Sequence, residues 1–432
     1  MTLRYAYYGD DFTGSTDVLE QLAEGGLEAV LFLRAPDAEL LARFSNVEAI
    51  GIAGDSRSRP PSWMEENLPA AFAALADADI VHYKTCSTFD SSRHTGSIGR
   101  ALDIGLAAFG APAAIVVAAP QMGRYVAFGN LFARVNGDVY RIDRHPTMSR
   151  HPVTPMHEAD LIRHMAEQTR KSIALVPLDE IQAGRACAAF DAAARNADAV
   201  LFDGVELRDL ARTGEVLLSR GLRFAVGSSG VTRALVLAWR ERGLIGNVIT
   251  PAQVNEVQRL LVVSGSCSPV TASQIAKAAQ QGFETLLIDV SAVLAGEHEV
   301  EERLTASALA VLGSGRSCVI HSAVGPLDTS QTPAGDRLGE ALGRIARTLI
   351  RQGGLRRVLF AGGDTSSHGV AQLGVDALTW AAPLESGAPL VRCHSADASV
   401  DGLQMVLKGG QIGSEDFFEL VRLGTVPARR PA

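Results

Sequence analysis

The sequence predicts an α/β fold of two domains, each with a largely parallel sheet flanked by helices. Three observations lead to this prediction. Short apolar runs alternate with longer segments of helical periodicity along most of the chain. The length of 432 residues exceeds what one ordinary hydrophobic core holds. A polar, glycine-punctuated passage from Arg240 to Asn247 interrupts the alternation, so we place the boundary there, between domains of residues 1–243 and 244–432.

The first domain opens with an apolar run, Leu3 to Tyr8, that predicts a strand. An amphipathic helix follows, for which Thr13, Ser15 and Asp17 are candidate caps. Further strands are expected at Ala29–Leu33, Ala49–Ile52, Ile80–Tyr83, Ala114–Ala118, Ile173–Val176, Ala199–Phe202 and Phe224–Val226. Helices are expected at Met64–Leu75, Ser97–Phe109, Glu158–Thr169, Ala186–Arg195 and Val231–Trp239. Phe128 to Pro155, rich in Arg, His, Pro and Asn, indicates a hairpin and a long loop.

The second domain repeats the alternation and then changes to closely spaced strands. Strands are expected at Leu260–Val263, Thr285–Ile288, Cys318–His321, Arg357–Ala361, Leu378–Pro383, Pro389–His394 and Gln404–Leu407. Helices are expected at Thr271–Gln281, Glu301–Leu312, Leu338–Arg351 and Ser366–Leu373, with a closing helix from Ser414. Parallel strands joined by helices fit most of this rhythm.

Composition narrows the classes of protein to consider. Hydrophobic residues make up 47% and charged residues 20%, a soluble globular balance, and no apolar run approaches the roughly 20 residues of a membrane span. Without a visible signal peptide, the predicted location is the cytoplasm. Five scattered cysteines argue against disulfides and structural zinc, and the absence of a basic stripe argues against nucleic acid. The oligomeric state stays open, a homodimer included.

Two adjacent carboxylates, Asp10 and Asp11, follow the first predicted strand and stand between Gly9 and Gly14. Open α/β sheets bind ligands at the carboxyl ends of their strands, and glycines allow a tight turn there. The free N–H groups of the helix that follows suit an anion. Taken alone, the stretch fits a ligand site and an acidic turn with a good helix cap equally well.

Two later strand ends carry cations and hydroxyls. Ser56 and Arg57 follow one strand, where a guanidinium can clamp a carboxylate or phosphate, although a solvated polar loop is the simpler interpretation. Lys84, one of only four lysines, opens the other stretch, which continues with Cys86, Ser87, Thr88 and Arg93. Such a set of donors before a helix suits an anionic, hydroxyl-bearing ligand, and a Ser/Thr-rich turn remains the alternative.

Three glycine-rich turns end strands of the second domain: Ser264-Gly265-Ser266, Gly362-Gly363-Asp364-Thr365 and Lys408-Gly409-Gly410. None is a Walker loop or a dinucleotide fingerprint. Small residues let backbone N–H groups surround phosphate oxygens, and Asp364 could bind Mg²⁺ directly or through water. A single glycine-rich turn is common in proteins, but three such turns at strand ends of one domain predict a nucleotide phosphate site.

These stretches, in this order along nearly the whole chain, resemble the four-carbon acid sugar kinase family. The resemblance rests on Asp10 to Gly14, Asp55-Ser56-Arg57, Lys84 with Ser87-Thr88, and the three glycine turns. It implies a kinase that phosphorylates acid sugars such as threonate, erythronate or 3-oxo-tetronates with ATP. It also implies an N-terminal domain that binds the acid, a C-terminal domain that binds the nucleotide, and catalysis in the cleft between the domains.

The resemblance further implies the residues of each half of the site. The sugar acid would face Asp10, Asp11, Thr13, Gly14, Ser56, Arg57, Lys84, Ser87, Thr88 and Arg93. ATP would face Ser264, Ser266, Gly362, Gly363, Asp364, Thr365 and Gly409, with Mg²⁺ at Asp364. Asp11 is the first candidate for the base that accepts the hydroxyl proton, and Asp10 the second. Arg57 and Lys84 would hold the carboxylate of the substrate.

One departure from the family pattern bears on the substrate. The family's Lys-Ile-Asp-Ser-Thr-Leu-Arg-Gly corresponds here to the stretch from Lys84 to Arg93, in which Cys86 replaces the acid and extra residues precede Arg93. The acid sugar therefore stays open, and a branched acid such as 3-oxo-isoapionate is an alternative. A non-catalytic sugar-acid sensor is the rival from another class, and an NAD-dependent oxidoreductase is disfavoured by the missing fingerprint.

Overall fold

The computed structural model describes residues 3–135, 137–151, 153–246, 254–322 and 333–425, with the side chains of 333–336 and 364 left aside. The chain forms two compact units that divide near residue 250, and each unit is described by itself. Both units are α/β, as the alternation of strands and helices predicted.

The first unit is built on the strand order β2-β3-β1-β4-β11-β5-β10-β9, and the strands from β3 to β9 are parallel. The strands are β1 (Tyr5–Gly9), β2 (Ala29–Phe32), β3 (Ala49–Ala53), β4 (Ile80–Lys84), β5 (Ala113–Val116), β9 (Ile173–Val176), β10 (Ala199–Phe202) and β11 (Phe224–Gly227). β1 to β5, β10 and β11 are fully buried, which explains their continuous apolar runs.

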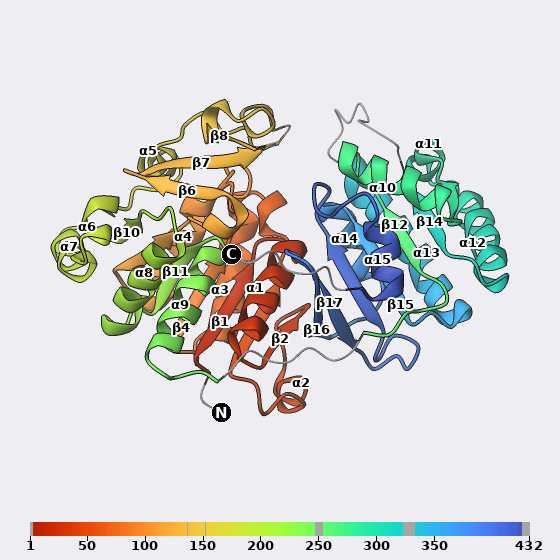
Figure 1. Ribbon diagram of the computed structural model, residues 1–432, viewed down its shortest axis with the longest axis horizontal. Helices are drawn as coiled ribbons and strands as arrows, with labels where there is room; N and C mark the ends of the chain where they lie inside the picture. Colours follow the sequence, from red (N-terminus) through yellow and green to blue (C-terminus); the bar gives the residue numbers. More distant parts are fainter. Residues whose placement is uncertain (1–2, 136, 152, 247–253, 323–332, 426–432) are drawn as a thin grey trace. The chain divides into compact units, whose positions relative to one another are not determined.

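Helices cover both faces of this sheet. They are α1 (Phe12–Gly25), α2 (Ala38–Ala42), α3 (Pro61–Leu75), α4 (Ile98–Phe109), α5 (Leu161–Ala166), α6 (Leu178–Gln182), α7 (Ala186–Ala193), α8 (Leu207–Ser219) and α9 (Ser229–Glu241). α9 packs between α1 and α8, whereas α3 and α4 pack together on the other face (Figure 1). Helix α8 was not expected from periodicity, although a capping box of Glu206 and Asp209 marks its start.

A small antiparallel sheet stands apart from the main sheet of this unit (Figure 1). It consists of β6 (Arg124–Ala127), β7 (Asn130–Val135) and β8 (Asp138–Arg141). β7 and β8 form the hairpin expected within 128–155, and β6 adds a third strand before it. Asp203, just past β10, accepts hydrogen bonds from the N–H groups of Phe128 and Gly129 at 2.6 and 2.9 Å. This carboxylate fixes the β6–β7 turn beside the end of the main sheet.

The second unit has the strand order β13-β14-β12-β15-β18-β17-β16. Its strands are β12 (Leu261–Ser264), β13 (Glu284–Leu287), β14 (Cys318–His321), β15 (Arg357–Ala361), β16 (Ala377–Glu385), β17 (Ala388–His394) and β18 (Gln404–Lys408). The first five strands of this order are parallel, and β17 and β16 continue them antiparallel. The three closely spaced strands expected near the end of the chain are therefore confirmed.

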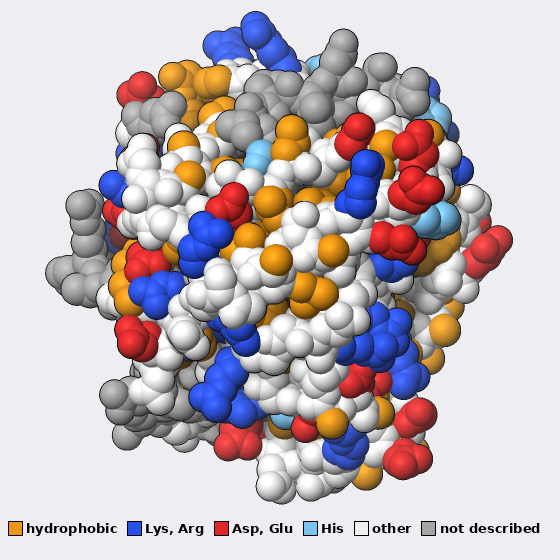
Figure 2. Space-filling model, turned by 90° about the vertical axis from the view of Figure 1, so that its right-hand side faces the viewer, with side chains coloured by type: hydrophobic (Ala, Val, Ile, Leu, Met, Phe, Trp, Pro, Cys, Tyr) orange, Lys and Arg blue, Asp and Glu red, His pale blue; other side chains and the backbone are white. Residues whose placement is uncertain are grey.

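Helices again flank the sheet of the second unit. They are α10 (Pro269–Gln280), α11 (Val290–Ala295), α12 (His298–Gly313), α13 (Pro333–Gly353), α14 (Gly363–Ala371) and α15 (Phe417–Leu423). α13 packs against α11, α12 and α14, while α10 packs against α15 (Figure 1). Acidic and basic side chains are interspersed on the face shown in Figure 2. The ion pair of Glu301 and Arg344 joins α12 to α13, and exposed pairs of this kind add little stability.

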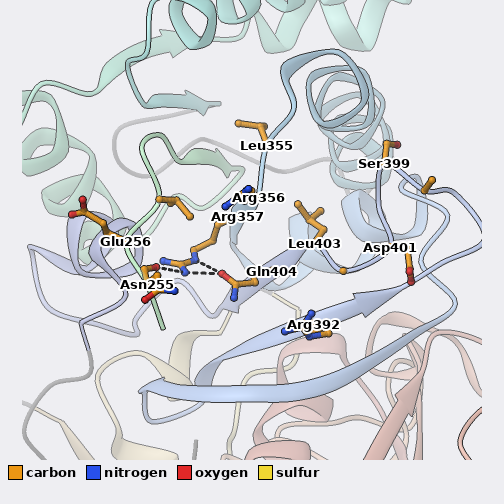
Figure 3. A pocket seen from close by; sticks show the side chains of 13 residues that line it. Asn255, Glu256, Leu355, Arg356, Arg357, Arg392, Ser399, Asp401, Leu403 and Gln404 are labelled. Atoms are coloured by element: carbon orange, nitrogen blue, oxygen red, sulfur yellow. Dashed lines mark hydrogen bonds between the residues drawn. The ribbon is translucent and has the colours of Figure 1, made fainter. Parts of the chain in front are cut away.

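One buried arginine ties several segments of the second unit together. Arg357 is 1% exposed and lies beside a cavity of about 470 Å³ at the amino end of β15 (Figure 3). Its guanidinium donates to Gln404 Oε1 at 2.6 and 2.9 Å and to the carbonyl oxygens of Val421, Arg422 and Asn255. These bonds link β15 to β18, to α15 and to the segment before β12.

Candidate active site

The acidic pair lies at the carboxyl end of β1, in the middle of the first sheet. Gly9 is in register with Ala53 of β3 and with Lys84 of β4. The chain runs from β1 to one side of the sheet and later returns to the other side, so β1 is where a crevice opens in this class of sheet. The N–H of Asp10 donates to the carbonyl of Lys84 at 2.9 Å, and the N–H of Arg57 donates to that of Asp10 at 3.1 Å. Both neighbouring strands thus hold the pair.

Asp11 is the cap of α1. Its Oδ1 accepts the N–H of Gly14 at 2.5 Å and the hydroxyl of Thr13 at 3.2 Å, and its Oδ2 accepts Arg57 Nη1 at 2.9 Å. Burial alone would raise the pKa of this carboxyl, but Arg57, Lys84 and the Gly14 N–H outweigh burial and lower it. The expected caps Thr13, Ser15 and Asp17 lie inside the helix, because α1 already begins at Phe12.

Asp10 is in the opposite electrostatic situation. Its side chain is 4% exposed, and its Oδ1 is buried without a hydrogen-bond partner among the described residues. Burial and the negative charge of Asp11 raise the pKa of Asp10 to about 7, although Arg57 and Lys84 act against this rise. A carboxyl group with a pKa near neutrality and a free oxygen is what general base catalysis requires.

Lys84 completes one wall of this cluster. It is 3% exposed, and its Nζ donates to the carbonyl of Thr85 at 3.0 Å. A Cβ placed on Gly14 would lie 2.8 Å from both Lys84 Nζ and Asp11 Oδ1, so the two charged groups share the space that glycine leaves open. The predicted grouping of the acidic pair, Gly14 and Lys84 is therefore present in the structure.

Arg57 is held by two carboxylates that are far apart in sequence. Its Nη1 donates to Asp11, and its Nη2 donates to both oxygens of Asp90 at 3.0 Å. Asp90 also accepts the hydroxyls of Thr88 and Thr154. Burial would raise the pKa of Asp90, but Arg57 and the two threonines lower it to about 2. Asp90 was not among the predicted site residues, although it stands in the stretch whose departure from the family pattern we noted.

The remaining predicted substrate residues fall in different surroundings. Thr88 belongs to the cluster through Asp90 and also donates to Cys86 Sγ at 3.1 Å. Ser56 is fully buried and hydrogen-bonded to Tyr83 Oη at 2.8 Å. Ser87 is buried next to Thr88, in the loop that follows β4. Arg93 is exposed, and its Nε donates to His94, so the structure does not bring it to the cluster.

Arg124 is a cation near this loop that the sequence did not single out. It begins β6, and its Nη1 donates to the carbonyl oxygens of Met122, Gly123 and Arg134. Its buried Nε has no partner among the described residues. Burial lowers the pKa of Arg124 and the neighbouring Cys86 acts against this, so the guanidinium lies near the substituted position of the loop. Periodicity gave no signal for Arg124, because only the folded position of the small sheet brings it here.

The three glycine turns of the second unit follow three adjacent parallel strands. Ser264 at the end of β12 is in register with Ala361 of β15, which is in register with Lys408 of β18. The N–H of Gly265 donates to Ala361 O at 3.2 Å, and the N–H of Gly362 donates to Lys408 O at 2.9 Å. The three turns, far apart in sequence, are thus neighbours at the carboxyl ends of these strands.

Two glycines of these turns, Gly265 and Gly410, are required by close approach. A Cβ on Gly265 would lie 2.1 Å from Thr365 Oγ1, and one on Gly410 would lie 2.7 Å from Ser266 Oγ. Gly362 has a φ of 113° and precedes α14, whose first turn has no side-chain cap. N–H groups at a helix start beside packed small residues suit a phosphate group, as the sequence predicted for these turns. Ser264, Ser266 and Thr365 of these turns are buried.

The sequence predicted Mg²⁺ at Asp364 and no membrane span. The side chain of Asp364 lies outside the described residues, so Mg²⁺ binding there stays a prediction. Among the described side chains, no group of three or more His, Cys, Asp or Glu is arranged to hold a metal. Within the same ranges, no helix has the length and apolarity of a membrane span.

Comparison with known proteins assigns the two halves of the chain to two kinds of domain. Residues 5–235 match a family of sugar-binding N-terminal domains, and residues 261–418 match a nucleotide-binding C-terminal domain. A 3-oxo-isoapionate kinase of Paraburkholderia graminis is 45% identical, over 98% of this chain and 94% of its own length. The chain belongs to the four-carbon acid sugar kinase family. This kinase-family chain is also 32% identical to a 3-oxo-tetronate kinase of Methylobacterium radiotolerans, over 97% of its residues and 98% of the relative's.

Solved structures share the fold of this family member. A protein from Salmonella typhimurium LT2 superimposes with a TM-score of 0.77 at 26% identity, covering 97% of this chain and 98% of that one. A Haemophilus influenzae protein gives a TM-score of 0.72 at 27% identity, covering 96% and 99%.

Proposed function

We propose that this protein transfers the γ-phosphoryl group of ATP to a terminal hydroxyl of a small sugar acid. The observation that carries the proposal is the buried carboxyl of Asp10, which has a pKa of about 7 beside the cations Lys84 and Arg57. Its Oδ1 has no hydrogen-bond partner among the described residues. In this proposal, residues 1–243 bind the acid and residues 244–432 bind the nucleotide. Curated relatives named 3-oxo-isoapionate kinase and 3-oxo-tetronate kinase support it.

Asp10 is our candidate for the base, and Asp11 for the residue that positions it. Asp10 accepts the proton of the substrate hydroxyl while that oxygen attacks the γ-phosphorus, and the bond to the β-phosphate oxygen breaks as ADP leaves. Asp11 is already occupied by the Gly14 N–H and by Arg57, and its lowered pKa makes it a weak base. Its negative charge raises the pKa of Asp10 and so keeps Asp10 reactive.

The substrate carboxylate needs cations that are not already neutralised. Arg57 is shared between Asp11 and Asp90, which leaves Lys84 and Arg124 as the candidates. The Nε of Arg124 has no partner within the described ranges. Arg124 lies near Cys86, the position at which the chain departs from the family pattern. We therefore propose that the loop of 85–90 together with Arg124 sets which acid is accepted.

The nucleotide half of the proposal rests on the three turns of the second unit. Backbone N–H groups at the start of α14 and the packed Ser266 and Gly410 surround the expected phosphate position. Mg²⁺, held with the nucleotide near Asp364, would neutralise phosphate charge during transfer. The cytoplasm is the proposed location, and catalysis where the two halves of the site meet is part of the proposal.

A coupled assay of ADP release tests the proposed activity. The panel contains 3-oxo-isoapionate, 3-oxo-tetronates, threonate and erythronate, with 3-oxo-isoapionate first because the 45% identical relative is named for it. Asp10→Asn should lower kcat by about 10² to 10⁴ with little change in KM. Near-normal turnover in that variant would overturn the base assignment. Binding of a sugar acid without any binding of ATP in calorimetry would replace the kinase by a sensor.

A further inference from the structure

Lys408 is the last residue of β18, in the second unit. It is the most deeply buried of the four lysines in the chain. Its exposure is 0%, compared with 3% for Lys84, whereas Lys171 and Lys277 have exposed side chains. Its Nζ donates to Thr271 Oγ1 at 3.0 Å and reaches the carbonyl of Gly410 at 3.5 Å. Thr271 in turn donates to that same carbonyl at 2.9 Å, which ties α10, the third glycine turn and Lys408 together.

Both partners of this ammonium group are neutral. β15, β17 and α14 pack around β18, α10 contacts it through the Thr271–Lys408 hydrogen bond, and the first glycine turn lies beside it. The titratable side chains on these elements are Cys267, Lys277, Arg357, Asp364, His368, Arg392, Cys393 and His394. Arg357 and Arg392 are in register with Gln404 at the far end of β18, and Lys277 pairs with Asp416 at 3.7 Å. Among the described side chains, none is an acid paired with Lys408.

A buried ammonium group without a counter-charge is unfavourable, because burial removes its hydration and two neutral acceptors replace only part of it. Accordingly, burial lowers the pKa of Lys408 to about 7. Lys408 nevertheless lies at the carboxyl end of β18, beside all three glycine turns. Its carbonyl accepts the N–H of Gly362 in the second turn, and Gly410 approaches Ser266 of the first turn. A phosphate group bound in that arrangement would supply a counter-charge that none of the described side chains provides.

We propose that Lys408 binds a nucleotide phosphate in the second unit and that it takes up a proton when the nucleotide arrives. The inference rests on the proposed function, since it takes this unit to be the nucleotide site. The inference goes beyond the proposed function, because it assigns the cation that binds the phosphate and makes the affinity for the nucleotide depend on pH.

The direction of the pH effect follows from linkage. A phosphate beside Lys408 favours its charged form and raises its pKa in the complex. At pH 8 the free protein carries mostly neutral Lys408, so binding takes up close to one proton, whereas at pH 6 the lysine is already charged. Above pH 7, affinity for ADP should therefore fall by about tenfold per pH unit until the pKa of the complex is reached.

Titration calorimetry of the full chain with ADP tests this inference. At pH 8, the apparent enthalpy is measured in two buffers of different ionisation enthalpy, which yields the number of protons taken up, and the pair is repeated at pH 6. The wild type should take up most of a proton at pH 8 and little at pH 6. Lys408→Arg keeps its charge at both values and should bind ADP without proton uptake. Lys277→Met, on the neighbouring α10, is the matched control and should behave as the wild type.

The outcomes separate this inference from the proposed function. Failure of the wild type to bind ADP at either pH contradicts the nucleotide site itself. Binding without proton uptake at pH 8, or uptake that persists in Lys408→Arg, overturns the role of Lys408 alone. The wild-type measurement decides the question even if Lys408→Met, expected to weaken ADP binding at least tenfold, does not fold.

Discussion

Asp10 and Asp11 are neighbours in sequence, yet only Asp11 has its oxygens occupied. Asp11 Oδ2 lies 2.9 Å from Arg57 Nη1, whereas Asp10 Oδ1 is buried with no partner in the described ranges. One carboxylate is therefore stabilised as an anion and the other is not.

Asp10 should cost the protein stability at alkaline pH. Its pKa is about 7 in the folded chain and 3.8 when unperturbed, so folding becomes less favourable as pH rises between these values. Asp10→Asn removes this cost and should raise Tm relative to the wild type more at pH 8 than at pH 4. Thermal denaturation at the two pH values measures the difference. The exposed Asp77→Asn is the control, and an equal effect of Asp10→Asn at both pH values would contradict the raised pKa.

Arg57 should be a large contributor to the stability of the first unit. Replacing it by Met leaves Asp11 and Asp90 without their shared partner, which should lower the free energy of unfolding by about 3 to 5 kcal/mol at pH 7. The pKa of Asp90 is lowered to about 2, so this contribution is present above pH 4 and is lost as pH falls toward 2.

Denaturant unfolding of Arg57→Met against Arg93→Met checks this expectation. Arg93 comes from the same part of the chain but is exposed, and its loss should change stability little. Equal stability of the two variants would show that the bridge between Asp11 and Asp90 contributes nothing.

Arg124 should matter for the sugar acid and not for the nucleotide. A charge-assisted hydrogen bond contributes about 1.5 to 3 kcal/mol, so Arg124→Gln should raise KM for the acid by about 10- to 100-fold with KM for ATP unchanged. Steady-state kinetics with each substrate varied in turn measures this. Arg134→Gln, on the adjacent β7 and exposed, should retain wild-type constants. If both variants keep the wild-type KM, Arg124 does not contact the substrate.

Arg357 should stabilise the second unit through neutral acceptors alone. Arg357→Met removes the donor to Gln404 Oε1 and to the carbonyl of Asn255, which should lower the free energy of unfolding by about 2 to 5 kcal/mol. The carbonyls of Val421 and Arg422 also lose the guanidinium but keep the N–H groups of Gly424 and Val257. The exposed neighbour Arg356 shares the cavity of Figure 3, and Arg356→Met should change stability by less than about 0.5 kcal/mol. Chemical denaturation followed by circular dichroism compares the two variants.

The sequence by itself determined the α/β class, the positions of most strands along the chain and the strand ends at which polar residues gather. These features are local: apolar runs fix strands, and glycines beside hydroxyl residues mark turns. It therefore located Asp10 to Gly14, Lys84 and the three glycine turns. The helix Glu158–Thr169 was expected too long, because Asp160 caps a shorter α5 at Leu161–Ala166.

Only the tertiary structure decided how those residues differ from one another. The pairing of Arg57 with Asp90 spans 33 positions, and the place of Arg124 depends on how the small sheet is anchored. The protonation of Asp10 and Lys408 depends on which atoms exclude water from them. Burial and long-range pairing are set by packing, and packing is not written in any short stretch of the chain.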